Sequence, residues 1–375
     1  MNILFISEIL PINTYASDVV FHRHFKRLIS EGHTIHILTD VNSYANRKKD
    51  LDSVFRIHLL PNRKWYYPPY KPYGILQKIR FFDYYQLHAK AIIEDNQIDT
   101  LIGFVYGDFL ATFCSFVQIK TGLPLYSFFH DDTSELNSHK SKKISIENSK
   151  KILDVSRFVF IASEALIDNW PQFSKKLKLL YPIPEDAREN DKLPIPTKNK
   201  AIAYSGSVYN EIIPYLEKVS LFLYHIRVPF YIIGNNDNAK YLSYSYKNVH
   251  YQTLFETAKE SNDFLIATCK ACIIPYPQLL IEMPWIKTCF PSKFIQYTRM
   301  GIPTIIIAPI ESALGKWCIK NKWPLYLKEY NQKELYELLA TKITTTETLN
   351  MIELFSSTMF NPDYIHKQLV NYLTL

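Results

Sequence analysis

The chain has 375 residues, of which 47% are hydrophobic and 21% charged, and its formal net charge is +7. These values indicate a globular protein that is long enough for two domains of ordinary size. No apolar run approaches the ~20 residues needed to cross a bilayer, so the sequence predicts no transmembrane helix. The mild basic excess is compatible with an anionic substrate, a membrane surface or a nucleic acid, and does not decide among them.

Short apolar runs alternate with helical stretches along the first half of the chain. The run at residues 1–6 has no basic flank, so we expect a first strand rather than a signal peptide. Most runs are continuous, as expected for parallel strands that are covered on both faces. The expected strands of this half are 3–6, 34–39, 55–60, 100–105, 125–129, 158–162 and 178–181, and the expected helices include 19–30, 76–95 and 163–170.

Residues 182–200 interrupt this rhythm, because they are rich in proline and charge and poor in core residues. We expect a linker there. After it come expected strands at 201–204, 230–233, 249–251, 271–275 and 304–308, with helices that include 211–225 and 334–341. The alternation is typical of doubly wound α/β sheets. Two such sheets joined by a linker imply a cleft, with ligands beyond the carboxyl ends of the strands.

The loop after the first strand contains no glycine, nor does the chain after it as far as Glu31, so we expect no close phosphate contact there. The polar residues of this loop, Thr14, Tyr15, Ser17 and Asp18, are candidates for hydrogen bonds to a ligand. The alternative is a solvated loop.

Aromatic and basic residues interleave over residues 63–90. Such a mixture suits a membrane interface or a lipid-linked ligand, and it can also stack on bases or sugars. The alternative is a loop and helix that use the aromatics for the core and the lysines for solubility.

His130 follows the expected strand 125–129, with Asp131 and Asp132 beside it. This position is the carboxyl end of a strand, where a histidine can bind a ligand and a carboxylate can orient the ring or accept a proton. The alternative is that Asp131 or Asp132 only caps the next helix.

Gly206 is one of only nine glycines and follows the expected strand 201–204, between Ser205 and Ser207. A residue without a side chain permits the close approach of a phosphate or a positive φ angle. The alternative is a simple turn at the end of the strand.

The five cysteines are odd in number and sparse, which favours a reducing compartment. Cys269 and Cys272 form a CxxC pair, but zinc needs two more ligands, and no second short pair exists. We therefore expect buried small residues and no metal site.

Residues 290–303 predict a short helix with both ends marked. Ser292 is placed to cap its start, Gly301 suits the left-handed position after its end, and Pro303 prevents continuation. Lys293 and Gln296 lie three residues apart and share one face. A helix N-terminus with a lysine is a site for a phosphate, whereas the alternative is an ordinary capped core helix.

The segments Pro291-Ser292-Lys293, Gln296-Tyr297 and Gly301-x-Pro303 resemble the donor-site motif of GT-B glycosyltransferases of the family 4 type. In such enzymes this helix holds the diphosphate and ribose of a nucleotide-sugar. The sequence departs from the motif at Gln296 and Thr288, where the family usually has glutamates. It also lacks the arginine and lysine that often follow the glycine equivalent to Gly206.

Weaker matches follow the same family order along most of the chain, among them residues 1–7, 31–35, 203–207 and 248–251. The resemblance implies an α/β protein of the GT-B type, in which two Rossmann-like domains face each other across a cleft. We expect an acceptor-side domain at 1–185, a donor domain at 186–354, and a C-terminal helix within 355–375 that packs back on the first domain.

The implied activity is transfer of a sugar from a nucleotide-diphosphate sugar to a hydroxyl of a glycan or lipid-linked glycan, with retention of configuration and without a metal or other cofactor. Catalytic candidates are His130 and Asp131. The implied donor-binding residues are Gly206, Ser207, Tyr251, Glu282, Ser292, Lys293 and Gln296, where Glu282 would replace the missing upstream carboxylate. Tyr15, Ser17 and Asp18 lie on the acceptor side.

Two other classes of function stay open. One is a different enzyme on the same fold, such as a sugar-nucleotide epimerase or a nucleic-acid glucosyltransferase. The other is a non-catalytic module that binds a nucleotide or glycan. We expect a cytoplasmic protein of cell-surface polysaccharide synthesis, with membrane contact through 63–90 as a further possibility and no nucleic acid partner.

Overall fold

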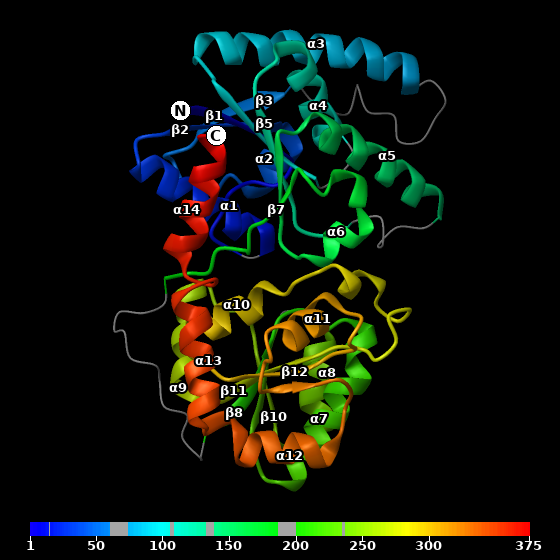
Figure 1. Cartoon of the computed structure of the whole chain (residues 1–375), viewed down its shortest axis with the longest axis vertical. Coiled ribbons are helices and arrows are strands. Elements are labelled where there is room, and N and C mark those ends of the chain that lie inside the picture. Colours follow the sequence, from blue (N-terminus) through cyan, green and yellow to red (C-terminus); the bar gives the residue numbers. More distant parts are fainter. Residues whose placement is uncertain (15, 61–73, 106–108, 133–138, 187–199, 235–236) are drawn as a thin grey trace. The chain divides into compact units, whose positions relative to one another are not determined.

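The computed structural model describes residues 1–14, 16–60, 74–105, 109–132, 139–186, 200–234 and 237–375, with the backbone alone at 16, 74–84, 109 and 139–145 (Figure 1). The chain divides into two compact units. The N-unit comprises Met1–Leu180 and Gln368–Leu375, and the C-unit comprises Tyr181–Lys367.

The N-unit is built on a seven-stranded parallel sheet in the order β3-β2-β1-β4-β5-β6-β7. The order reverses at β1, which pairs with β2 on one side and β4 on the other, as in doubly wound nucleotide-binding folds. The strands are β1 (Asn2–Ile6), β2 (Thr34–Asp40), β3 (Arg56–Leu60), β4 (Thr100–Phe104), β5 (Leu125–Phe129), β6 (Phe158–Ile161) and β7 (Leu177–Leu179).

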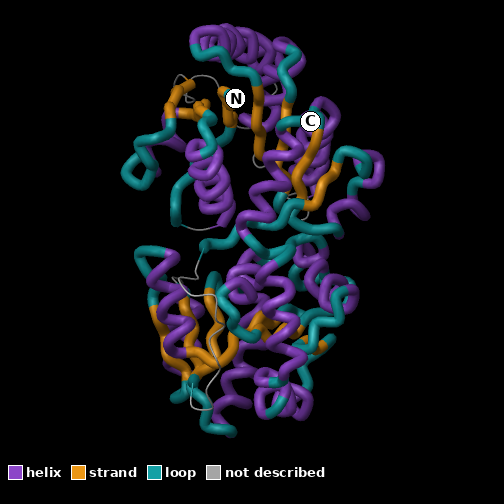
Figure 2. The backbone as a smooth tube through the Cα atoms, turned by 60° about the vertical axis from the view of Figure 1, so that its left-hand side comes forward, coloured by secondary structure: helices purple, strands orange, loops and turns teal. Residues whose placement is uncertain are grey.

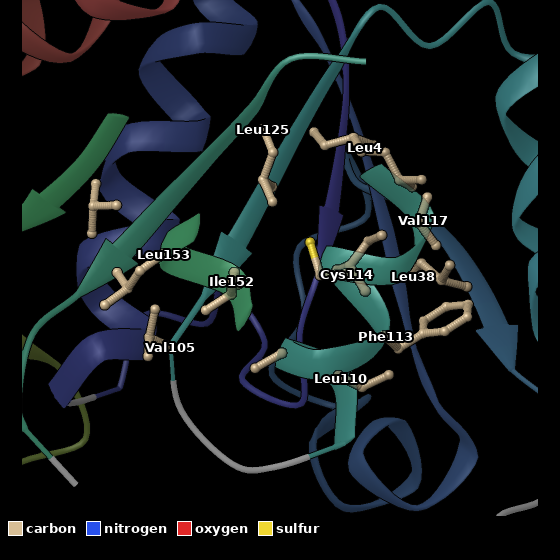
Figure 3. Close-up of a cluster of buried hydrophobic side chains, with 14 of the residues drawn as sticks. Leu4, Leu38, Val105, Leu110, Phe113, Cys114, Val117, Leu125, Ile152 and Leu153 are labelled. Carbon is tan, nitrogen blue, oxygen red and sulfur yellow. The ribbon is translucent and has the colours of Figure 1, made fainter. Parts of the chain in front are cut away.

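Helices cover both faces of this sheet, so its strands are apolar on both sides (Figure 1). Leu4 on β1 packs with Cys114 and Val117 of α4, as Figure 3 shows. Phe5, the next residue, points to the opposite face, where its ring centroid lies 4.7 Å from that of Phe21 on α1. The helices are α1 (Ala16–Ser30), α2 (Val41–Arg47), α3 (Gly74–Asp95), α4 (Phe109–Thr121), α5 (His139–Val155), α6 (Ala165–Asn169) and the 3₁₀ turn η3 (Pro171–Phe173).

The C-terminal helix α14 (Pro362–Leu373) ends within the N-unit. Tyr126 on β5 donates a hydrogen bond of 3.2 Å to the carbonyl oxygen of Leu373. The ring of Tyr372 lies 5.2 Å from that of Phe158 and 5.8 Å from that of Phe160. The last residues of α14 are therefore fixed to β5 by a hydrogen bond and to β6 by aromatic packing.

The C-unit contains a six-stranded parallel sheet in the order β10-β9-β8-β11-β12-β13, which repeats the pattern of the first sheet. Its strands lie between helices (Figure 2). The strands are β8 (Ala201–Ser205), β9 (Phe230–Ile233), β10 (Val249–Gln252), β11 (Cys269–Pro275), β12 (Thr304–Ile307) and β13 (Tyr326–Leu327). The helices are η4 (Asn210–Ile212), α7 (Ile213–His225), α8 (Asp237–Ser245), α9 (Ala258–Thr268), η5 (Pro284–Lys287), α10 (Ser292–Arg299), α11 (Ala313–Lys320), α12 (Gln332–Ala340), η6 (Lys342–Thr344) and α13 (Thr346–Ser357).

Phe294 in the first turn of α10 is fully buried in an aromatic cluster. Its ring centroid lies 5.0 Å from those of Trp317 and Trp323, 5.8 Å from Phe360 and 6.0 Å from Phe290. Such ring pairs prefer tilted and edge-on arrangements like these. The cluster therefore fixes the start of α10 against the rest of the C-unit.

Every strand expected from the sequence is present, and two parallel-sheet α/β units confirm the predicted fold class. The short edge strand β13 was not predicted. Cys269 and Cys272 are buried on β11. In the part of the chain that is described, no three potential metal ligands form a cluster, and no helix is long and apolar enough to cross a membrane.

Candidate functional site

The N-terminus of α10 differs from the expectation in its capping residue. Pro291 is the N-cap, with an extended backbone (φ −70°, ψ 116°), and Ser292 is the first helical residue and is exposed. The prediction that Ser292 caps the helix is therefore wrong, because the chain enters the helix one residue earlier. Proline has no polar side chain, so no side chain caps α10, and the backbone amides of its first turn receive no side-chain acceptor at the cap.

The C-terminus of α10 ends as predicted. Gly301 has φ 77°, its N–H donates to Thr298 O at 3.0 Å, and the N–H of Ile302 donates to Tyr297 O at 2.9 Å. These two bonds form a Schellman motif, which requires a left-handed residue at the glycine. The stop signals in the sequence thus fix where the helix ends.

Lys293 and Gly206 lie in direct contact, although 87 positions separate them in the sequence. Gly206 follows β8 with φ +129°, and the Nζ atom of Lys293 occupies the place that a Cβ atom on Gly206 would take. The same Nζ atom lies 5.4 Å from the ring centroid of Tyr204. The fold therefore brings together the two features that the sequence marked as phosphate-binding.

The loop after Gly206 is held by polar contacts. Tyr204 donates from its hydroxyl to Ser207 O at 2.7 Å, and Asn238 Nδ2 in the first turn of α8 donates to Val208 O at 2.8 Å. Gly234, at the end of β9, is also required, because a Cβ atom there would lie 2.8 Å from Gly206 O. The loop is thus fixed before any ligand binds.

Burial lowers the pKa of Lys293 to about 8, and nearby Cys289 opposes this shift only in part. Desolvation disfavours the ammonium form, and no described carboxylate pairs with it to offset this penalty. A bound phosphate would supply the missing negative charge. The arrangement of an uncapped helix N-terminus, a half-buried lysine and a bare glycine is therefore suited to an anion.

Gln296, one turn after Lys293, already has a protein partner. Its Oε1 atom accepts a hydrogen bond of 2.8 Å from the backbone N–H of Glu185, at the start of the predicted linker. Its Nε2 atom is buried and has no partner among the described residues. Asn262 on α9 donates to Glu185 Oε2 at 2.8 Å, and Arg299 donates to Asp186 Oδ1 at 3.0 Å. Gln296 therefore helps to fasten this segment to α10 within the C-unit.

Three other predicted donor residues are Glu282, Tyr251 and Ser207, of which Ser207 directly follows Gly206. Glu282 is exposed and accepts a hydrogen bond of 3.1 Å from the hydroxyl of Tyr215. Tyr251 is half-buried on the edge strand β10, and the side chain of Ser207 is exposed. No hydrogen bond or ring contact recorded for the described residues joins these side chains to Lys293.

In the N-unit, His130 and Ser17 meet at the carboxyl end of the sheet. The Oγ atom of Ser17, in the first turn of α1, lies 2.9 Å from His130 Nδ1. The imidazole lies among the rings of Phe21, Phe104 and Phe128 at centroid distances of 5.8, 5.2 and 6.0 Å. Burial lowers the pKa of His130 to about 4, so the ring is neutral near pH 7 and can donate from one nitrogen and accept at the other.

The acidic candidates of the N-unit have structural partners. Asp132 is buried and accepts from Trp170 Nε1 at 3.0 Å and from Asn169 Nδ2 at 3.3 Å, which fastens the end of α6. Asp18 is buried and pairs with Arg47 of α2. Burial raises the pKa of Asp18, against the opposing attraction of Arg47.

Asp131 is half-buried on the loop after β5, next to His130. Tyr15 lies outside the described residues. Sequence reasoning missed Tyr204, although a signal existed: residues two apart on a strand share one face, so Tyr204 and Gly206 were expected on the same side of the sheet.

No family model and no curated protein sequence matches this chain. Solved structures do match over its whole length. Sucrose-phosphate synthase from Thermosynechococcus elongatus is 15% identical with a TM-score of 0.67, covering 99% of this chain and 98% of that one. The lipopolysaccharide outer core galactosyltransferase WaaB in its apo form is 12% identical with a TM-score of 0.64, covering 100% and 99%.

HepE from Anabaena, solved in complex with UDP and glucose, is 13% identical with a TM-score of 0.63, covering 100% and 99% of the two chains. A protein from Listeria monocytogenes assigned as a UDP-N-acetylglucosamine 2-epimerase is also similar, at 11% identity and a TM-score of 0.59, covering 99% and 94%. The chain therefore has the GT-B fold. At these identities the similarity establishes the fold alone.

Proposed function

We propose that the protein is a glycosyltransferase that moves a sugar from a nucleoside-diphosphate sugar to a hydroxyl of a glycan or lipid-linked glycan. The observation that carries the proposal is the ammonium group of Lys293, which lies against Gly206 at the uncapped N-terminus of α10. A diphosphate is bound well where a fixed positive charge lies next to a glycine, because its oxygens can then approach the backbone closely. The GT-B neighbours, several of which are glycosyltransferases, support the same assignment.

In this proposal Lys293 and the first amides of α10 act on the leaving group. As the bond between the sugar and the diphosphate breaks, negative charge grows on the phosphate oxygens, and these groups neutralise it. The acceptor oxygen bonds to the anomeric carbon, and its proton passes to the departing diphosphate. The neutral His130, oriented by Ser17, binds a sugar hydroxyl. Retention of configuration and independence of a metal follow from the motif resemblance.

A two-step assay tests the proposal. UDP, GDP and ADP and their sugars are first screened by thermal shift, because a ligand that binds only the folded protein raises its melting temperature. The best donor is then incubated with a set of glycan and lipid-linked acceptors, and release of nucleoside diphosphate is measured. We expect a donor-dependent shift and acceptor-dependent release. Absence of a shift with every nucleotide would overturn the proposal.

A non-catalytic binding module is the second candidate. It is favoured by Gln296, which stands where a ribose-binding glutamate is expected and whose Oε1 is already bonded to Glu185. This candidate predicts a thermal shift with no product under any condition. The similarity to an assigned epimerase raises a third outcome, in which the nucleotide-sugar alone is converted without release of nucleoside diphosphate.

The acceptor side of the proposal includes contact with the cytoplasmic face of a membrane. It rests on the aromatic and basic composition of 63–90, of which 63–73 lie outside the described residues. The similarity to an enzyme of lipopolysaccharide synthesis supports a cell-surface glycan as the product. We expect the protein to sediment with anionic liposomes at low salt. If it does not, the proposed membrane contact is excluded.

Replacing Gln296 with glutamate is expected to strengthen UDP binding a few-fold. A carboxylate still accepts the hydrogen bond from the N–H of Glu185, and it forms charge-assisted bonds with ribose hydroxyls. The free protein should be less stable, because the second carboxylate oxygen replaces a buried Nε2 atom. Calorimetric titration measures the affinity, with Gln296→Leu as the control that removes the acceptor. Equal affinities for all three proteins would exclude Gln296 from the ribose site.

A further inference from the structure

Tyr204 contacts both Lys293 and the loop after Gly206. Its ring centroid lies 5.4 Å from Lys293 Nζ, and its hydroxyl donates to Ser207 O at 2.7 Å. The side chain of Tyr204 is only 7% exposed, whereas Lys293 is half-buried and Ser207 is exposed. The side chain of Tyr204 therefore links Lys293 to the loop after Gly206.

The ring matters because Lys293 has no carboxylate partner among the described residues. A buried ammonium without a counter-ion adopts whichever position offers negative potential, and the face of a tyrosine ring offers it. Without that face the lysine side chain has several rotatable bonds and no fixed place. The position of Nζ against Gly206 then depends on Tyr204.

The hydroxyl of Tyr204 acts on the loop after Gly206. Gly206 has φ +129°, and the chain after it turns so that Ser207 O points back toward Tyr204. Asn238 holds the same loop further along, at Val208. The hydroxyl of Tyr204 thus fixes the loop at the residue next to Gly206, where the exposed backbone must be rigid to bind an anion.

We propose that Tyr204 is a positioning residue, which holds the ammonium of Lys293 over Gly206 with its ring and fixes the adjoining loop with its hydroxyl, so that both face one phosphate group. This proposal rests on the proposed function only for the identity of the ligand. The two contacts themselves exist in the free protein, and each has a separate test without any donor.

The first test changes the charge distribution of the ring and keeps its shape. Phenylalanine and pentafluorophenylalanine at position 204 are compared, because fluorination removes the negative potential of the ring face. The pH dependence of acylation of Lys293 by a trace reagent, followed by mass spectrometry, gives the pH at which this lysine is half-protonated. Exposed Lys287 serves as the internal reference.

Wild type and Tyr204→Phe should share one midpoint, and the fluorinated protein should show a midpoint lower by about half to one pH unit. Lys287 should not move. Identical midpoints for Lys293 in all three proteins would overturn the role of the ring. Both variants fill the space of the original ring, so loss of folding does not confuse the comparison.

The second test concerns the hydroxyl. Hydrogen exchange of peptides that cover 206–210 should be several-fold faster in Tyr204→Phe than in wild type, whereas the control Tyr209→Phe, on an exposed ring, should leave it unchanged. Unchanged exchange in Tyr204→Phe would overturn the role of the hydroxyl.

A final measurement connects these contacts to the ligand. UDP should bind the fluorinated protein and Tyr204→Phe several-fold more weakly than wild type. If wild type itself binds no nucleotide, the proposed function fails while the labelling and exchange results still decide the role of Tyr204. If UDP binds all proteins equally, the positioning role is overturned and the proposed function stands.

Discussion

Replacement of Lys293 with methionine should make the free protein more stable and remove most of its affinity for a nucleoside diphosphate. Burial lowers the pKa of Lys293 to about 8, which means that the folded protein holds this ammonium at a cost. Methionine has a similar length, no charge and enough flexibility to fill the same space. We expect a gain of about 1 kcal/mol or more in the free energy of unfolding near neutral pH.

The pH dependence of this gain has a defined sign. The pKa of Lys293 is about 8 in the folded protein, and its ordinary value is 10.5. Between these values the unfolded chain binds more protons, so the stability of wild type rises with pH through this window. The methionine variant lacks that rise. The advantage of the variant should be full below pH 8 and disappear toward pH 10.5.

Whereas its stability should rise, the affinity of the methionine variant for UDP should fall. Removal of one partner of a desolvated charge pair costs about 2–5 kcal/mol, so UDP should bind the variant roughly 100-fold more weakly. Chemical denaturation measures the stability, and calorimetric titration measures the affinity. Lys287→Met is the matched control, because Lys287 is exposed and should show neither effect. A variant that is less stable than wild type, or that binds UDP normally, contradicts this assignment of Lys293.

Much of the fold could be predicted because parallel strands buried on both faces leave continuous apolar runs in the sequence. The bounds of β5 and β9 agree with the expectation residue for residue, and the end of α10 follows from Gly301. The two-residue strand β13 was missed, because two residues on a sheet edge produce no such run.

The sequence could predict those parts of the candidate site that depend only on where a residue lies in the fold. Gly206 and Lys293 were assigned separately and meet, and so do Ser17 and His130, because the carboxyl ends of parallel strands and the helix N-termini that follow them share one edge. The lowered pKa values of Lys293 and His130 result from burial, which depends on tertiary packing and could not be predicted from the sequence.

The partners of single side chains could not be predicted. Asp18 pairs with Arg47, and Glu282 accepts a hydrogen bond from Tyr215. The sequence around either carboxylate does not indicate its partner. The capping error at Ser292 has a local cause, because the sequence Pro-Ser leaves the entry residue ambiguous by one position. Sequence distance hides contacts of this kind until the tertiary structure is known.

Gly206→Ala should abolish detectable donor binding and destabilise the C-unit. Two effects add: an alanine at φ +129° is strained, and its Cβ atom falls on the Nζ atom of Lys293. The alanine therefore forces the ammonium away from the place where the phosphate would meet it. Stability should fall by more than about 1 kcal/mol, and the thermal shift with UDP should be lost.

Two controls separate these effects. Gly122→Ala places a side chain at φ +70° with nothing within 4 Å, so it reports the backbone strain alone and should leave binding intact. In a Lys293→Ala background the clash is absent, so Gly206→Ala should cost less stability than in wild type, with a coupling of about 0.5–3 kcal/mol in a double-mutant cycle. Additive effects of the two substitutions would show that Lys293 does not occupy this position in solution, and the phosphate site would then have to lie elsewhere.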